Sequence, residues 1–317
     1  MAAATRPSSI RGYGEMELVL AFCEHQLRVR NRQPTTVNTY ALSLRSWAEW
    51  PHGGMLRADH RDMEAWVQRP RVRRAHGKLG AAATRKKDVA TLRVFYRWLV
   101  AQGALTSDPT LQLHAPTVHN VLPKPVPEHV WLEVWKQAER LPTPDVVMLG
   151  LGYFVGLRRA EITRLHADQV TPTRLVGLRR KGGGEDAVPF DEMVGVIHDE
   201  LPHLIGDKDR FLGPLDELRK ARRGRLLMPW LADEDGIDPQ TVTRRVASVL
   251  RRLGVQGRFT PHQMRHSCAT NLIGAGVPLP IVSNLLNHSS IEITMRYVKA
   301  GESELQAWRL AQVARRR

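Results

Sequence analysis

Apolar side chains recur every three or four residues through the first hundred positions, the interval at which they share one face of an α-helix. This pattern predicts four helices, which lie near Met16–Val29, from Pro34 onward, near His60–Val67 and over about Ala81–Gln102. Gly103 directly follows the fourth stretch, in the position where helices commonly end. A four-helix N-terminal domain is therefore expected.

The same spacing assigns particular side chains to the core of this domain. On the first two helices these are Leu18, Phe22, Leu27, Tyr40, Leu44 and Trp47. On the fourth helix they are Leu92, Phe95, Tyr96, Leu99 and Val100. Thr35 or Thr36 is a suitable N-cap for the second helix, because its hydroxyl oxygen can accept a backbone N–H.

The pattern breaks between Ser107 and His129, where five prolines occur and neither helical nor strand periodicity is sustained. This segment predicts a linker. We therefore expect a disordered start over residues 1–14, a helical domain over 15–108, a linker over 109–128 and a second domain over 129–317. A chain of 317 residues is long enough for each domain to bury its own core.

Beyond the linker, helical periodicity returns with one interruption. Helices are predicted near Val130–Arg140, Asp145–Phe154, Gly156–Leu165, Asp191–Leu201 and Asp238–Leu253, and the last third reads as helical. Two short strands, near Arg174–Arg180 and Ala187–Phe190, flank the turn at 181–184 as a hairpin. The fold class expected is mainly α, with a mixed but mostly helical second domain that holds a small antiparallel hairpin.

Charge and composition narrow the choice of partner. The formal net charge is +15 and the pI is near 10.5, which favours a polyanionic partner, nucleic acid before a lipid surface. The longest apolar stretch, 146–157, is too short to span a bilayer, and the N-terminus does not resemble a signal peptide. Cys23 and Cys268 are too few for a disulfide framework, so a cytosolic location is expected.

Basic side chains cluster in the N-terminal domain with few acidic neighbours, and we expect them to contact phosphates. The clusters comprise Arg69, Arg71, Arg73 and Arg74, then Arg85, Lys86 and Lys87, then Arg93 and Arg97. A solvated helix face is the alternative reading of the same pattern.

Candidate chemistry lies in the second domain. Thr260 and Gln263 form a capping box, so His262, Arg265 and His266 share one face of the helix that follows. Further on, Asn287 tolerates a left-handed helix end, and His288 follows it directly.

Three more positions complete the set of candidates. Ser289 and Glu292 can start another helix, which carries Tyr297. Upstream, Arg158 stands at a helix entry with Glu161 one turn later, and Lys181 begins the hairpin turn. Taken singly, each of these side chains is more typical of a surface or a core than of a catalytic site.

In this order, the residues resemble the tyrosine site-specific recombinase family, which includes phage integrases and Xer proteins. The resemblance covers nearly the whole chain. It is carried by GLRxxE at 156–161, the hairpin lysine Lys181, HxxR at 262–265, and a histidine nine residues before a tyrosine at His288 and Tyr297. Residues 85–109 also resemble the last helix of that family's core-binding domain.

The resemblance implies a DNA strand exchange that proceeds through a 3′-phosphotyrosyl intermediate, with Tyr297 as the nucleophile. Arg158 and Arg265 would bind the phosphate, because guanidinium groups donate paired hydrogen bonds to its oxygens. His262 would help to activate the tyrosine, Lys181 would protonate the leaving 5′-oxygen, and His288 would stabilise the transition state. No metal and no cofactor is expected.

Partners also follow from the resemblance: double-stranded DNA and further copies of the chain, a dimer on one site and a tetramer in synapsis. The tail, 299–317, would pack on a neighbouring subunit or on its own domain. A bacterial or phage-encoded cytoplasmic protein is implied, without the arm-binding domain of many phage integrases. A type IB topoisomerase and a non-catalytic DNA-binding relative are the alternatives.

The chain departs from the family pattern at three places. One is Met264, which stands in for the leucine of a common HxLRH variant that His266 after Arg265 otherwise fits. The family often has GKG followed by a lysine and an arginine in the hairpin, whereas residues 181–186 here read KGGGED. The family's leucine-glycine-histidine is Leu286, Asn287 and His288 in this chain. A left-handed asparagine can replace the glycine, since asparagine is the residue that adopts this conformation most readily after glycine.

Overall fold

The structure, a computed structural model, describes residues 10–70, 80–118, 124–179, 185–231, 238–287 and 295. The chain divides into two compact units, Met1–Asn120 and Val121–Arg317, each with its own hydrophobic core. No helix among the described residues combines the length and the apolar character needed to cross a membrane.

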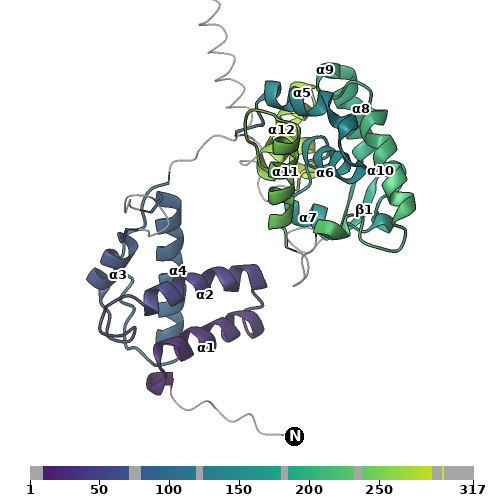
Figure 1. Cartoon of the computed structure of the whole chain (residues 1–317). Helices are drawn as coiled ribbons and strands as arrows, with labels where there is room; N and C mark the ends of the chain where they lie inside the picture. Colours follow the sequence, from purple (N-terminus) through teal and green to yellow (C-terminus); the bar gives the residue numbers. More distant parts are fainter. Residues whose placement is uncertain are drawn as a thin grey trace, which may run out of the picture. The chain divides into compact units, whose positions relative to one another are not determined.

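The first unit consists of helices around an aromatic core. Its elements are η1 (Ile10–Gly12), α1 (Glu15–Arg28), α2 (Pro34–Ala48), α3 (His60–Val67) and α4 (Ala82–Ala101). Figure 1 shows α1 and α2 side by side, with α4 crossing them. The hydroxyl of Tyr96 accepts a hydrogen bond from Trp47 Nε1 (3.1 Å) and donates one to the Met55 carbonyl (2.9 Å), which satisfies two buried polar groups inside this core.

The core of the first unit confirms most of the predicted residues, with one correction on α1. Leu18 and Phe22 are buried, but Leu27 is 40% exposed and Gln26 is buried beside them. Leu27 follows Phe22 by five residues, which places it about 140° around the helix from that buried side chain. Only side chains three or four residues apart share one face of a helix, so the interval of five residues should have excluded Leu27 from the predicted core.

The start of α2 also differs from the prediction. The helix begins at Pro34, with Gln33 at the N-cap position and no side-chain cap, so neither Thr35 nor Thr36 caps it. A proline at the first helical position has its φ fixed near the helical value and no N–H to satisfy, and it can start a helix without a capping hydroxyl. Gly103, by contrast, ends α4 with a positive φ of 70°, as expected.

The second unit is built around α6 (Thr143–Tyr153), a helix buried along most of its length. Around it lie α5 (Glu128–Lys136), η2 (Ala138–Arg140), α7 (Arg159–Arg164), η3 (Ala167–Gln169), α8 (Phe190–Glu200), α9 (Pro202–Ile205), α10 (Asp209–Ala221), η4 (Pro229–Leu231), α11 (Gln240–Arg252), α12 (Pro261–Gly274) and α13 (Leu279–Leu285). Helices α10, α11 and α12 pack directly on α6 (Figure 1).

The strands β1 (Leu175–Arg179) and β2 (Glu185–Val188) form an antiparallel pair, with Leu175 opposite Val188. The second strand starts earlier and ends earlier than predicted, because Phe190 already begins α8. These two strands are the only sheet in the described part of the chain. The structure therefore confirms the mainly α fold with one small antiparallel hairpin.

Trp131 of α5 anchors the beginning of the second unit. The ring of Trp131 stacks on Tyr153 of α6 with centroids 3.5 Å apart, and its Nε1 donates to the Leu204 carbonyl (2.9 Å). Just before α5, the backbone N–H of Val126 donates to Ser267 Oγ of α12 (2.9 Å). The segment that enters the second unit is therefore hydrogen-bonded to the helix that carries His262 and Arg265.

Candidate functional site

The candidate site lies where the chain leaves α6, enters α7 and meets α12. Gly156 makes this junction possible. Its φ is +70°, and a Cβ atom there would lie 2.6 Å from Leu286 Cδ2 and 3.0 Å from Cys268 Sγ. Both the conformation and the close approach of the neighbouring side chains favour glycine. The chain can consequently turn into α7 with Arg158 directly before its first residue.

Glu161 caps α7 and also holds Arg158. Its Oε2 accepts the backbone N–H of Arg158 (2.7 Å), while its Oε1 accepts the guanidinium Nη1 of the same residue (2.8 Å). A carboxylate in the first turn is stabilised by the positive end of the helix dipole. The orienting partner that the sequence suggested for Arg158 is confirmed.

Arg265 occupies a buried position on α12. Only 5% of the residue is exposed, and its guanidinium donates to the carbonyls of Gly156 (2.6 Å) and Leu286. A buried arginine is stabilised only when its charge and N–H groups are matched by acceptors. Here, two backbone carbonyls and a carboxylate supply that match.

The carboxylate is again that of Glu161, whose Oε2 lies 4.0 Å from Arg265 Nη1. One buried acid therefore contacts two arginines that are 107 positions apart in the sequence, Arg158 and Arg265. The sequence indicated only the contact with Arg158. The second contact depends on how α12 packs on α6, which residue spacing does not reveal.

Arg158 also reaches the end of α13, where its Nη2 donates to the Asn287 carbonyl (2.8 Å). Asn287 has a φ of +46°, which confirms the predicted left-handed helix end. Arg158 keeps a side-chain exposure of 31%. Since a guanidinium carries five N–H donors, this partly exposed group retains donors for an anion.

His262 and His266 lie next to the two arginines. Thr260 and Gln263 form the predicted capping box at the start of α12, with the Thr260 N–H donating to Gln263 Oε1 (3.1 Å). The rings of the two histidines are 4.2 Å apart at their centroids. His262 is exposed and His266 is partly buried.

Burial and neighbouring positive charge both disfavour protonation of these histidines. Desolvation, followed by Arg265, Arg158 and Arg159, lowers the pKa of His262. For His266, desolvation, His262 and Arg265 lower the pKa to about 4. Both imidazoles are therefore neutral at pH 7, the state in which a histidine can accept a proton.

The structure brings together three of the six predicted catalytic residues: Arg158, His262 and Arg265. The other three, Lys181, His288 and Tyr297, lie outside the described residues. His288 directly follows Asn287 in the sequence. The basic residues Arg71, Arg73 and Arg74 and the tail 299–317 also lie outside the described residues.

The basic residues of the first unit do not behave as one group. Arg69 is buried: its guanidinium lies 3.6 Å from Asp88, 3.8 Å from the centre of the Trp66 ring, and donates to Ser46 Oγ (3.1 Å). The expectation that Arg69 contacts phosphate is therefore wrong, since this side chain is committed to the core of the unit.

The basic residues on α4 are more accessible. Lys86, Lys87 and Arg97 are exposed, whereas Arg85 and Arg93 are partly buried. Arg93 donates to the Leu113 carbonyl (2.6 Å), and Arg85 donates to the Gly80 carbonyl (3.2 Å). Lys86, Arg93 and Arg97 follow one another at intervals of seven and four residues, so they share a single face of the helix.

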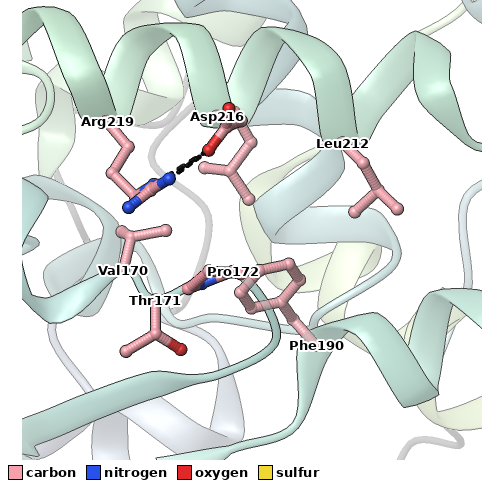
Figure 2. Close-up of a pocket in the computed structure, with 8 residues that line it drawn as sticks. Val170, Thr171, Pro172, Phe190, Leu212, Asp216 and Arg219 are labelled. Carbon is pink, nitrogen blue, oxygen red and sulfur yellow. Dashed lines mark hydrogen bonds and ion pairs between the residues drawn. The ribbon is translucent and has the colours of Figure 1, made fainter.

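Two hollows in the second unit are lined by residues other than the candidate catalytic ones. One, of about 30 Å³, is bounded by Thr171, Pro172 and Phe190 and by the ion pair of Asp216 with Arg219 (Figure 2). It has room for little more than water. The other, of about 430 Å³, is lined by Glu139, Asp207, Asp209, Arg210 and others. Neither hollow includes Arg158, His262 or Arg265.

Comparison with known protein families finds two matches along the chain. Residues 127–304 match the profile of the Phage integrase family. Residues 19–103 match the Phage integrase, N-terminal SAM-like domain. The first match spans more than half of the 317 residues and includes all the candidate catalytic positions.

Individual proteins agree with these profiles. The tyrosine recombinase XerC of Mycobacterium leprae is 28% identical over 304 residues, which cover 92% of this chain and 97% of that protein. A lambda integrase tetramer bound to a Holliday junction is similar in structure, with a TM-score of 0.66, 17% identity and coverage of 89% of this chain and 76% of that one. XerH bound to a palindromic difH substrate in a post-cleavage complex has a TM-score of 0.61, 15% identity and coverage of 94% and 85%.

Proposed function

Because the chain belongs to the phage integrase family and is a tyrosine recombinase, we propose that Arg158, Lys181, His262, Arg265, His288 and Tyr297 form its active site. Recombinases of this family exchange DNA strands at specific sites. In this proposal, the six residues perform the cleavage and rejoining.

The contact of Glu161 with both Arg158 and Arg265 is the observation that carries the proposal. The carboxylate holds two guanidinium groups together, that of Arg158 partly exposed and that of Arg265 buried. In this proposal a phosphodiester receives hydrogen bonds from both. Attack on phosphate requires charge on its non-bridging oxygens to be neutralised. The arginines supply that neutralisation.

Tyr297 attacks the phosphorus through its hydroxyl oxygen, and the bond between phosphorus and the 5′-oxygen breaks. His262, which is neutral at pH 7, accepts the phenolic proton, and Lys181 gives a proton to the leaving 5′-oxygen. His288 donates a hydrogen bond to the phosphate. The product is a 3′-phosphotyrosyl ester, which a second 5′-hydroxyl attacks to rejoin the strand.

The proposed substrate is double-stranded DNA, bound by copies of the chain that pair on one site and form a tetramer when two sites meet. The net charge of +15 supports this partner, and so does the similarity to a lambda integrase tetramer bound to a Holliday junction. Such a substrate places the protein with bacterial or phage DNA in the cytoplasm.

A nicked suicide substrate tests the proposal. The released fragment diffuses away, so the covalent adduct accumulates and can be measured on a denaturing gel. The wild-type chain should form this adduct in EDTA as well as in magnesium. Tyr297→Phe should form none, while Tyr40→Phe, which removes the hydroxyl of a half-buried tyrosine in the first unit, should react like wild type. An adduct with Tyr297→Phe would overturn the proposal.

The type IB topoisomerase alternative makes a different product. A recombinase joins strands from two sites, whereas a topoisomerase only relaxes supercoils. A plasmid that carries two copies of the recognised site should therefore yield recombinant circles.

A further inference from the structure

Helix α1 presents an apolar stripe to solvent. Met16, Leu20 and Leu27 are 45%, 64% and 40% exposed, and Cys23 is half-buried between them. The intervals of four, three and four residues place all four side chains within about 60° of the helix surface. They form a continuous line along the helix, which we call the α1 stripe.

The stripe is not needed by the core of the first unit. Leu18, Val19 and Phe22 bury the other side of α1 against that core. Contiguous exposed apolar side chains on a folded unit commonly mark a protein contact. No basic residue of α1 lies within the stripe itself, so its surface suits another apolar surface better than it suits DNA.

Charges beside the stripe define the orientation of a partner. Glu17, Glu24 and Arg28 lie along the same edge, about 70–110° from the centre of the stripe. Glu24 Oε1 pairs with Arg28 Nη1 of the same helix (3.0 Å), on an exposed surface where Arg28 can also meet a second carboxylate. Glu17 is near the start of α1 and Arg28 is its last residue. Arg30 and Arg32 extend the positive end. The edge is thus acidic at one end and basic at the other.

An antiparallel copy of α1 would match this edge. A two-fold axis through the middle of the stripe reverses the direction of the second helix but keeps the same edge on the same side of the pair. Glu17 of one copy then faces Arg28 of the other, and the two apolar stripes meet. A parallel two-fold pair would instead place the two charged edges on opposite sides, where Glu17 and Arg28 of the two copies do not meet.

We propose that the α1 stripe is a contact between two copies of this chain, with the helices antiparallel and Cys23 close to the two-fold axis. This inference goes beyond the proposed function and does not depend on the identity of the catalytic residues. A single helix stripe is smaller than the roughly 800 Å² per partner of a standard interface. The pairing is therefore weak, and it forms when copies are already concentrated.

Cys23 provides a direct test, because the only other cysteine is fully buried. The full-length chain, at high concentration and without DNA, is treated with copper phenanthroline and run on a non-reducing gel. Partial burial raises the pKa of Cys23, so the reaction is run under alkaline conditions. We expect a disulfide-linked dimer from wild type and none from Cys23→Ser.

A matched pair of variants separates a specific contact from random collision. Leu20 and Leu42 are both 64% exposed, but Leu20 is in the stripe and Leu42 is on α2. Leu20→Glu should reduce the initial rate of cross-linking at least fivefold, whereas Leu42→Glu should leave it unchanged. Equal rates in wild type and Leu20→Glu would overturn the proposal.

Charge reversal tests the antiparallel orientation. Arg28→Glu and Glu17→Arg should each slow cross-linking, and the two changes combined should restore it. Glu17 also accepts the Gly14 N–H (2.7 Å), so Glu17→Arg weakens the start of the helix. The combined variant carries the same weakness, and restoration of its rate can come only from the restored charge match. If the combined variant is slower than both single variants, the antiparallel pairing is wrong.

Discussion

The guanidinium of Arg158 donates a hydrogen bond of 2.8 Å to the backbone carbonyl of Asn287, which lies 129 positions later in the chain. Asn287 ends its helix with a φ of +46°, and its carbonyl accepts this bond in that conformation. The position of one arginine of the candidate site therefore depends on a backbone conformation that few residue types adopt readily.

Two substitutions at position 287 should separate conformation from side-chain chemistry. Asn287→Gly keeps the positive φ and should preserve both stability and DNA cleavage. Asn287→Val should lower the free energy of unfolding by about 1–2 kcal/mol, because a β-branched residue is strained there. Urea unfolding and suicide-substrate cleavage measure the two effects. A valine variant as stable as the glycine variant would show that the conformation is unimportant.

Glu161→Ala should be among the most damaging changes in the site, because it leaves two arginines without their shared carboxylate. Removing one partner of a buried ion pair typically costs about 3–5 kcal/mol. The partial exposure of Arg158 places the expected loss at the lower end of that range. Cleavage should fall further than DNA affinity does. Glu161→Gln keeps acceptor atoms and should lie between Glu161→Ala and wild type in both measurements.

Gly156→Ala should destabilise the second unit through contact as well as conformation. A Cβ there would lie 2.6 Å from Leu286 Cδ2, whereas Gly254, which has a similar φ of +67°, has open space around it. Gly254→Ala measures the conformational cost alone, about 1–2 kcal/mol. Gly156→Ala should cost about 1–3 kcal/mol more, from the overpacking. Equal losses of unfolding free energy would contradict the close packing at this junction.

Acid should destabilise the second unit through His266. The folded state keeps this imidazole neutral down to a pKa of about 4, whereas an unfolded histidine takes up a proton near its ordinary value of 6.5. The contribution of His266 to stability is therefore complete above pH 6.5 and is lost as the pH falls from 6.5 toward 4. His266→Gln should show a shallower dependence of unfolding free energy on pH in that range. An unchanged slope would contradict the lowered pKa.

The basic residues of the first unit should divide into two classes. Arg69→Ala should lower the free energy of unfolding of that unit by about 3 kcal/mol, because Asp88 loses a buried partner. Lys86→Ala and Arg97→Ala should change stability by less than about 0.5 kcal/mol. If these two residues bind phosphate, each change should weaken DNA binding. It should also reduce the slope of log affinity against log salt concentration by about one, because one fewer counterion is released. Binding unaffected in the Lys86 and Arg97 variants would assign the DNA contact elsewhere.

Local signals in the sequence predicted much of this structure. The capping box at Thr260, the helix end at Asn287 and the pairing of Arg158 with Glu161 each involve residues within a few positions of one another. Such contacts are determined by backbone geometry over one turn, so spacing alone can identify them.

Contacts between distant segments were not predictable in this way. Burial of Arg69 depends on Asp88, which comes from another helix, and Arg265 meets Glu161 only once α12 packs on α6. Helix α10 escaped prediction for a different reason. It contains Gly213 and Pro214, residues that usually interrupt a helix, and only tertiary packing of Phe211 and Leu215 shows that the helix continues through them.

The acceptors that hold the two arginines have a consequence for sequence variation. Arg265 donates to the carbonyls of Gly156 and Leu286, and Arg158 donates to that of Asn287. These are main-chain atoms, and no substitution removes them. Homologous chains can therefore change residue type at positions 286 and 287 and still retain both arginine contacts, provided that the new residues allow the same backbone path. Glu161 has no such freedom, because its contribution is a side-chain carboxylate that serves both arginines.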